Sequence, residues 1–182
     1  PIPYFGERVD DNWIFEPKID GWRIQLIRQP DGGLEIWGRR LERKPDWTAK
    51  LRSILTPAEQ FLPKGTIVDG ELYSEGGRRF IPSLFARKPK TRPIIWLFDL
   101  IYHRGRFIGN LPLEKRKELL SRIRPVPPFF LTPFQPVTDL DQALNDAVTR
   151  GDEGIVIKRL DSPYELGRDG PIATHNWRKI KP

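Results

Sequence analysis

The chain has 182 residues, of which 38% are hydrophobic and 30% charged, and its ten phenylalanines and six tryptophans can fill a folded core, which argues against disorder. The absence of cysteine excludes disulfides, thiol catalysis and cysteine-zinc sites, and two histidines are too few for a histidine-rich metal centre. The net charge of +7 favours a polyanionic partner, either nucleic acid or the phosphates of a nucleotide.

The sequence shows no membrane or secretion signal. It contains no run of about 18 apolar residues. Its start, Pro1-Ile2-Pro3, lacks the charged and apolar regions of a signal peptide. We therefore expect a cytoplasmic or nucleoid-associated monomer with no membrane partner. The missing methionine suggests a piece of a longer protein or a processed one.

The first half of the chain favours strands over helices. Apolar patterns indicate strands at 13–16, 23–28, 34–37 and 66–73. A turn at 30–33 (PDGG) joins the second and third of these strands as a hairpin. Apolar residues at i, i+4, i+7 and i+8 from Trp47 predict a helix over 47–55 with Asp46 as its N-cap, and a short helix is expected at 82–86.

The run 94–102 (IIWLFDLIY) is the most apolar stretch of the chain. Its β-branched and aromatic residues predict a central strand. Further strands are expected at 106–109, 155–157 and 177–180. The proline-rich stretch 125–136 is predicted to be extended, with room for one short strand, and a polar loop at 161–176 precedes the last strand.

Two helices are predicted in the second half. The first covers 113–123, with an inner face formed by Leu113, Leu119, Leu120 and Ile123. The second is capped by Thr138 or Asp139, runs to about Val148 and is stopped by Gly151. With these elements we expect a single α+β domain of antiparallel sheets with helices packed outside.

Residues 16–23 (EPKIDGWR) place a lysine, Lys18, directly after a predicted strand. The pair Asp20-Gly21 then turns the chain into the next strand. A lysine at such a strand-turn-strand junction is positioned to face a cleft. By itself, the short pattern fits a solvated lysine beside a hairpin turn as well.

Four more stretches place charged residues where a buried strand would exclude them. The charged residues are Asp69 and Glu71, Asp99, Glu153 and Lys158, and Lys179 and Lys181. Alternate residues of a strand share a face, so each pair spaced by two is expected to point the same way. Carboxylates can hold a hard divalent cation and lysines can hold phosphate, so the set indicates one polar cleft. Ordinary interpretations remain for each member: Glu71 can pair with an arginine, the terminal lysines can be solvated, and Phe98 can be core.

In order and content these stretches resemble the covalent nucleotidyltransferases, and most closely the ATP-dependent DNA ligases. The matching motifs are EPKIDGWR (16–23), DGELY (69–73), WLFDLIY (96–102), EGIVIK (153–158) and WRKIKP (177–182), with SPYELGR (162–168) before the last. The phrase WIFEPKIDGWR further resembles the ligase module of bacterial and archaeal end-joining enzymes. The resemblance implies an adenylation domain over residues 1–182. It also implies an ATP-grasp-like nucleotidyltransferase fold, in which two antiparallel β-sheets flanked by α-helices enclose the nucleotide cleft.

The resemblance assigns roles on the nucleoside side of the site. Lys18 resembles the catalytic lysine that attacks the α-phosphate of ATP and carries AMP. Glu16 resembles the residue that reads the adenine edge. Phe98 resembles the aromatic ring that stacks on the base, opposite an aliphatic side chain of 155–157.

It also assigns roles on the phosphate side. Arg23 and Arg39 resemble the pair that contact the ribose and later a nucleic-acid phosphate. Glu71 resembles a carboxylate at the ribose or metal, and Glu153 the carboxylate that holds Mg²⁺ or Mn²⁺ over the α-phosphate. The lysines of the last motif, Lys179 and Lys181, resemble the two that neutralise this phosphate as pyrophosphate leaves. Asp20 is expected mainly to shape the turn.

The implied substrate is nicked duplex DNA, in repair, replication or recombination, and the implied partner is an OB-fold domain of the same full-length protein. Family members continue into that domain, whereas this sequence stops at Pro182. We therefore expect these residues to bind ATP and adenylylate themselves slowly, without sealing nicks efficiently alone. Three alternatives stay open: an RNA ligase, a capping-type guanylyltransferase, and a basic nucleic-acid-binding module without catalysis.

Overall fold

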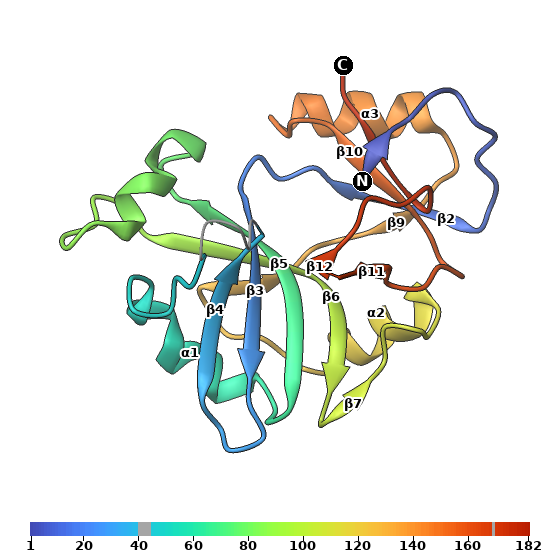
Figure 1. The fold of residues 1–182 in the computed structure, drawn as a ribbon. Coiled ribbons are helices and arrows are strands. Elements are labelled where there is room, and N and C mark those ends of the chain that lie inside the picture. Colours follow the sequence, from blue (N-terminus) through green and yellow to red (C-terminus); the bar gives the residue numbers. More distant parts are fainter. Residues whose placement is uncertain (40–44, 169) are drawn as a thin grey trace.

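The computed structural model describes residues 1–39, 45–168 and 170–182 as two β-sheets with helices outside (Figure 1). The helices are α1 (Leu55–Phe61), α2 (Leu113–Ser121) and α3 (Leu140–Thr149), with 3₁₀ helices η2 (Arg52–Ile54) and η3 (Arg78–Phe85). None of the described helices is long and apolar enough to cross a membrane.

The larger sheet has the strand order β4-β3-β5-β6-β7, and β8 pairs with β6. Its strands are β3 (Trp22–Arg28), β4 (Leu34–Gly38), β5 (Thr66–Ser74), β6 (Pro93–His103), β7 (Arg106–Phe107) and β8 (Phe129–Leu131). All neighbours are antiparallel except β6 and β8, which run parallel. The long strands β5 and β6 lie at its centre, which agrees with the continuous apolar run predicted there.

The smaller sheet has the order β1-β13-β10-β2-β9. Its strands are β1 (Ile2–Pro3), β2 (Trp13–Pro17), β9 (Gln135–Pro136), β10 (Ile155–Arg159) and β13 (Trp177–Ile180). Here β1 runs parallel to β13, and the other pairs are antiparallel. A separate ribbon joins β11 (Leu166–Gly167) to β12 (Gly170–Pro171). The expected α+β class with two mostly antiparallel sheets and flanking helices is confirmed.

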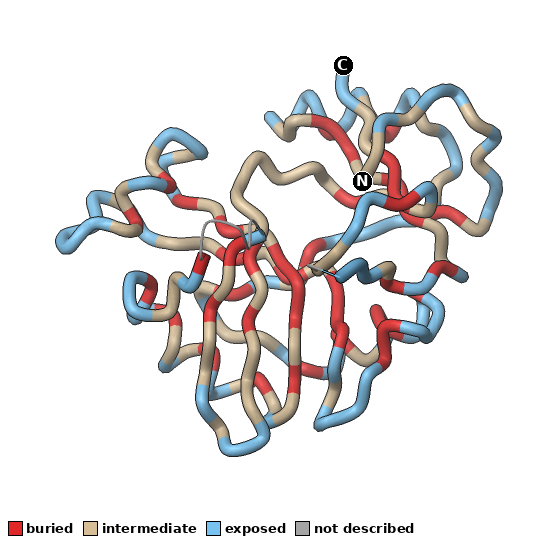
Figure 2. The backbone as a smooth tube through the Cα atoms, viewed as in Figure 1, coloured by how far each residue is buried: buried red, intermediate tan, exposed pale blue. Residues whose placement is uncertain are grey.

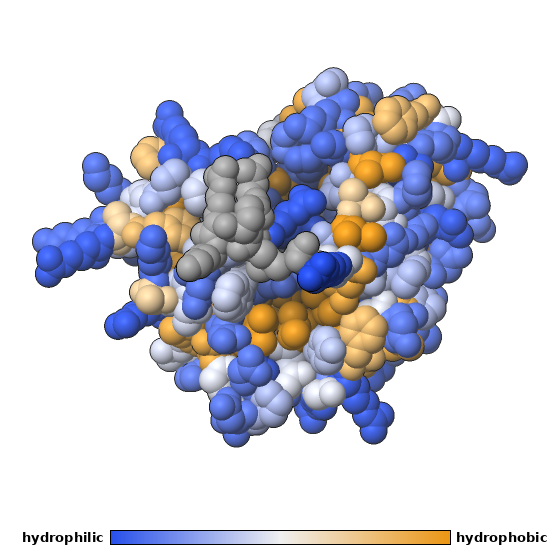
Figure 3. All heavy atoms as spheres, in the orientation of Figure 1, coloured by the Kyte–Doolittle hydropathy of each residue, from blue (hydrophilic) through white to orange (hydrophobic). Residues whose placement is uncertain are grey.

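Each sheet has its own apolar core, and buried backbone follows the central strands in Figure 2. Strands of the larger sheet pack against α1 and α2 through fully buried residues such as Leu26, Leu72 and Ile95. The smaller sheet packs against α3 through Ile155 and Ala147, among others. The outer face in Figure 3 is mostly hydrophilic, which fits the high charged content.

The predicted helix over 47–55 is wrong. Asp46 and Trp47 lie against the edge of β4 instead, where the Trp47 amide donates to the Ile36 carbonyl at 2.8 Å, and a turn at 48–50 and η2 follow before α1. The Asp46 side chain accepts from the Thr48 amide at 3.0 Å and caps no helix. The α-helix begins only at Leu55, with Pro57 in its first turn, where a missing N–H costs nothing. Pairing with the edge of β4 therefore outweighs the helix that the apolar spacing from Trp47 predicts.

The proline-rich stretch 125–136 holds two short strands where one was expected. The first, β8, joins the larger sheet, and the second, β9, joins the smaller sheet. This segment thus passes from one sheet to the other. The short helix expected at 82–86 is present as part of the longer 3₁₀ helix η3.

The predicted helices α2 and α3 are confirmed. Asp139 is the N-cap of α3, because its carboxylate accepts from the Gln142 amide at 3.0 Å. Gly151 follows α3 with a φ of +89°, which an L-residue rarely adopts.

Helix α2 buries more than its predicted apolar face. Leu113 and Leu120 lie inside as expected, but so do Arg116 and Lys117. The Arg116 guanidinium donates to both carboxylate oxygens of Asp99, at 2.8 and 3.0 Å, and both side chains are fully buried. This bidentate pair anchors α2 to β6.

Replacing Arg116 with methionine is expected to destabilise the fold by about 3–5 kcal/mol, because the buried Asp99 carboxylate loses its partner. Denaturant unfolding measures the effect. The matched control is Arg122→Met at the exposed C-cap of the same helix, where the ion pair with Glu118 is solvated. The expected change in this control is below about 0.5 kcal/mol. Equal losses in both variants would contradict an anchoring role for the buried pair.

Candidate active site

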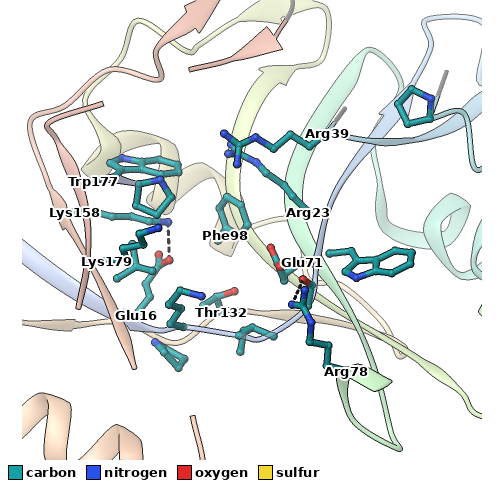
Figure 4. A pocket seen from close by; sticks show the side chains of 18 of the residues that line it. Glu16, Arg23, Arg39, Glu71, Arg78, Phe98, Thr132, Lys158, Trp177 and Lys179 are labelled. Atoms are coloured by element: carbon teal, nitrogen blue, oxygen red, sulfur yellow. Dashed lines mark hydrogen bonds and ion pairs between the residues drawn. The ribbon is translucent and has the colours of Figure 1, made fainter. Parts of the chain in front are cut away.

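A cleft of about 760 Å³ opens between the two sheets (Figure 4). The smaller sheet lines it through β2, β10 and β13, and the larger sheet through β3, β5 and β6. Of the nine residues that the resemblance assigns to catalysis or to nucleotide or metal binding, seven line this cleft: Glu16, Lys18, Arg23, Arg39, Glu71, Phe98 and Lys179. The other two lie beside Lys18: Glu153 forms an ion pair with Lys18, and Lys181 forms one with Glu153.

Lys18 stands at the end of β2 and is tied to the start of β10. Its amide donates to the Gly154 carbonyl at 2.9 Å. Gly154 has a φ of +144°, and a Cβ there would lie 2.1 Å from the Ile180 carbonyl oxygen. Only glycine therefore lets the Glu153 turn lie against both neighbouring strands.

One carboxylate holds two of the lysines. Lys18 and Lys181 form ion pairs with different oxygens of Glu153. Burial by itself raises the pKa of Glu153, but hydrogen bonds from the two lysines bring that pKa below its usual range. Glu153 is therefore ionised at neutral pH and positions the Lys18 amine at the cleft.

Glu16 points into the cleft from β2 and is almost fully buried. Its two oxygens form ion pairs with Lys117 of α2 and with Lys158 of β10, the latter at 2.6 Å. Burial lowers the pKa of Lys158 to about 8, with Glu16 opposing the shift and Lys117 adding to it. Both carboxylate oxygens of Glu16 thus have a lysine partner on the cleft wall.

Phe98 of β6 and Val156 of β10 line the cleft from opposite sheets. The Lys158 ammonium lies 4.5 Å from the centre of the Phe98 ring and 4.0 Å from that of Trp177. The Thr132 hydroxyl and the Trp177 indole N–H are buried with no hydrogen-bond partner among the described residues. Buried polar groups normally have a partner, so a ligand in this cleft can supply one.

Arg23 is held rigidly on β3. Its Nε donates to Asp69 of β5 at 3.0 Å, and its guanidinium also donates to the Tyr164 hydroxyl at 3.0 Å. Tyr164 donates in turn to Asp69. Burial alone lowers the pKa of Arg23, but the Asp69 charge raises it above the usual range, so Arg23 stays charged.

Glu71 lines the cleft two residues after Asp69. Burial, together with the charge of Asp69, raises the pKa of Glu71 to about 7, against the opposing effects of Arg23, Lys18 and Arg78. The carboxyl is thus close to half-ionised at neutral pH, and a bound cation would favour its ionised form.

Asp20 lies on the loop that follows Lys18 rather than among the cleft carboxylates. It forms an ion pair with Arg78 at 2.6 Å, and Arg78 also donates to the Gly21 carbonyl at 3.2 Å. A Cβ at Gly21 would lie 2.3 Å from the Leu72 carbonyl oxygen. Asp20 and Gly21 together hold the loop against β5.

The described residues contain no cluster of three histidines, aspartates or glutamates that could hold a metal ion by themselves. Mg²⁺ needs only one or two protein carboxylates when phosphate oxygens and water complete its coordination. Glu153 and the cleft-lining Glu71 fit that donor set.

Several cleft residues were not assigned a site role from the sequence. Thr132 and Trp177 line the cleft, whereas Lys117 and Tyr164 contact the cleft-lining residues Glu16 and Arg23 from behind. Tyr164 lies in the quoted SPYELGR motif, which was a usable signal. For Lys117 and Thr132 the sequence offers no local signal, because their positions depend on distant partners.

Residues 4–181 match the family described as ATP dependent DNA ligase domain. The chain belongs to this family. It is 30% identical to a probable DNA ligase of Dictyoglomus turgidum over 91% of this chain, and 30% identical to the prophage-derived DNA ligase-like protein LigB of Bacillus subtilis over 94%. These matches span 30% and 62% of the two relatives.

Solved structures of DNA ligases are also similar to this chain. The ligase domain of Mycobacterium tuberculosis LigD matches with a TM-score of 0.71 and 27% identity, over 93% of this chain and 53% of that domain. A mycobacterial DNA ligase D complexed with ATP and MES matches with a TM-score of 0.73 and 25% identity, over 99% of this chain and 60% of the other. The resemblance to end-joining ligase modules is therefore consistent with the structural neighbours.

The raised pKa of Glu71 predicts a pH-dependent stability. The folded protein holds this proton more tightly than the unfolded chain, so the contribution is complete below the ordinary pKa of 4.5 and is lost as the pH rises through about 7. Glu71→Gln cannot ionise, so its stability relative to wild type should rise by about 1–3 kcal/mol between about pH 5 and pH 8.

Denaturant unfolding at the two pH values measures this difference. Glu59→Gln, on the exposed side of α1, is the matched control and should show no such change. A Glu71→Gln difference that stays constant with pH would show that the carboxyl is not perturbed.

Proposed function

We propose that this chain is the adenylation domain of an ATP-dependent DNA ligase, which binds ATP and forms a covalent lysyl-AMP on Lys18. One observation carries the proposal. The Lys18 amine lies at a cleft between two sheets, held by Glu153 beside Lys181, with Lys179 and Arg23 facing the same space. Three segments far apart in sequence thus bring the amine together with charges that suit a phosphate.

The adenosine part of ATP is proposed to lie between the sheets. The base stacks on Phe98 with Val156 on the opposite wall, and Glu16 accepts from its amino edge. Stacking requires the Lys158 ammonium to leave the space over the Phe98 ring. Arg23, Arg39 and Glu71 then surround the ribose.

The chemical step is an in-line displacement at the α-phosphorus. The Lys18 nitrogen, having lost its proton to solvent, forms the N–P bond as the P–O bond to the β-phosphate breaks and pyrophosphate leaves. Lys179 and Lys181 neutralise the charge that develops on the phosphate oxygens. This reaction requires alignment and charge neutralisation more than acid-base chemistry.

Glu153 and Glu71 are proposed to hold Mg²⁺ or Mn²⁺ together with the phosphate oxygens. When bound, the metal ion supplies further neutralisation of the phosphates. Glu153 would thus serve both the Lys18 amine, with which it forms an ion pair, and the metal ion.

The later steps need nicked duplex DNA. AMP is proposed to pass from Lys18 to the 5′-phosphate of the nick, and the adjacent 3′-hydroxyl then displaces AMP and forms the phosphodiester bond. An OB-fold domain of the same full-length protein is proposed to orient pyrophosphate and to clamp the duplex. These 182 residues alone are therefore expected to adenylylate slowly and to seal nicks poorly.

Incubation with ATP and Mg²⁺ followed by intact-mass measurement tests the first step. Wild type should gain the mass of one AMP, and Lys18→Arg should gain none, because its guanidinium stays protonated. Lys115→Ala, on the exposed side of α2, is the control and should gain AMP as wild type does. An adduct on Lys18→Arg would contradict the assignment of the nucleophile.

The same measurement with GTP separates the base preferences, and assays of nicked DNA and nicked RNA separate the ligase classes. ATP and nicked DNA should be preferred. A preferred GTP adduct would instead indicate a capping-type guanylyltransferase, and preferred sealing of RNA would indicate an RNA ligase.

A further inference from the structure

We propose that residues 78–92, which we call the basic strip, form a surface that binds the phosphate backbone of duplex DNA on one side of the cleft. The inference deepens the proposed function and rests on it. It assigns the duplex to a particular face of the larger sheet and to particular side chains.

The strip holds most of the net charge of the chain. Its cations are Arg78, Arg79, Arg87, Lys88, Lys90 and Arg92. No aspartate or glutamate occurs between residues 76 and 98, so these six charges leave a net charge of only +1 for the rest of the protein. Such a concentration on one segment differs from a well-mixed surface, in which both signs alternate.

All six cations are exposed, and hydrophilic side chains project from this region at the left edge of Figure 3. Within the described part of the chain, only Arg78 pairs with a carboxylate, Asp20. The strip is η3 and the loop that leads into β6, so its cations stand along an extended segment rather than around a pocket. This arrangement suits a linear polyanion better than a single phosphate.

The strip is held in shape by contacts beneath it. The Lys90 amide donates to the Ser83 hydroxyl at 2.7 Å, and the Glu75 amide donates to the Arg92 carbonyl at 3.1 Å. The apolar residues Ile81 and Leu84 are buried in the main core. The backbone that carries the cations is therefore ordered before any partner binds, which lowers the entropic cost of binding.

The strip begins at the cleft itself. Arg78 lines the cleft and binds the Asp20-Gly21 turn that follows Lys18. Behind it, Phe85 packs against Trp22 and Trp47, which also line the cleft, with ring centres 5.6 and 5.0 Å away. A duplex whose 5′-phosphate reaches Lys18 can therefore continue past Arg78 onto the strip.

The test measures binding of a fluorescent nicked DNA duplex by anisotropy over a range of salt concentrations. The variant replaces Arg87, Lys88 and Lys90 with glutamine, which removes three cations from the part of the strip beyond the cleft. Each lost phosphate contact should reduce the slope of log K against log salt by about 1, so the slope should fall by about 2–3 and affinity at low salt by at least about tenfold.

The matched control replaces Lys64, Arg104 and Arg106 with glutamine. These exposed cations lie around the β6–β7 turn and the Gly65-Gly105 contact, at the opposite end of the larger sheet. The control loses the same charge and should keep the wild-type slope. Equal effects of the two triple variants, an unchanged slope in the strip variant, or no binding of duplex by wild type would each overturn the proposal.

Self-adenylation of each variant with ATP separates the two proposals. Both triple variants should gain AMP as wild type does. Loss of AMP transfer together with DNA binding in the strip variant would show that the strip supports the ATP site or the fold, and the surface proposal would fail. A wild type that binds DNA through the strip but never gains AMP would refute the adenylation proposal and leave the strip standing.

Discussion

Two adjacent cations of α2 hold the two sheets of this protein in their relative positions. Arg116 reaches Asp99 on β6 of the larger sheet, and Lys117 reaches Glu16 on β2 of the smaller sheet. The start of the helix adds two more ties, because the amides of Leu113 and Glu114 donate to carbonyls in the loop after β10. Since the cleft lies between the sheets, its width depends on this helix.

Buried ion pairs are an expensive way to join two layers, because each charge loses its hydration. Unlike an apolar contact, however, these ion pairs also place charged groups beside the cleft. The lysines that neutralise Glu16 are themselves placed beside the cleft, and Lys158 lies against two aromatic rings. The interaction that aligns the sheets therefore also sets the charge of the wall where a base would lie.

The same principle governs the phosphate side of the site. Lys18 and Lys181 share Glu153, while Arg23 is fixed by Asp69 and Tyr164. Each cation is preorganised by a carboxylate, whose place a bound anion can partly take. Under the proposed function, the phosphates would therefore meet cations that are already in place, which is what stabilisation of developing charge requires.

The sequence by itself determined where most of the longer strands lie along the chain, the loop that presents Lys18 and the set of charges placed in otherwise apolar strands. These features are local: alternation, turn residues and motif spacing can be read from neighbouring positions. The roles of the site residues also came from motifs, and they remain proposals.

The tertiary structure alone decided which charges are buried and which partners they have. Apolar periodicity gave α2 its inner face but could not place Arg116 or Lys117 inside, since a charge is buried only where a distant carboxylate meets it. The apolar spacing from Trp47 likewise predicted a helix, but Trp47 pairs with the edge of β4, which lies at a distance in the sequence. Whether a segment forms a helix or pairs with a strand, and whether a charge is buried, depends on contacts between segments far apart in the chain, which no local pattern encodes.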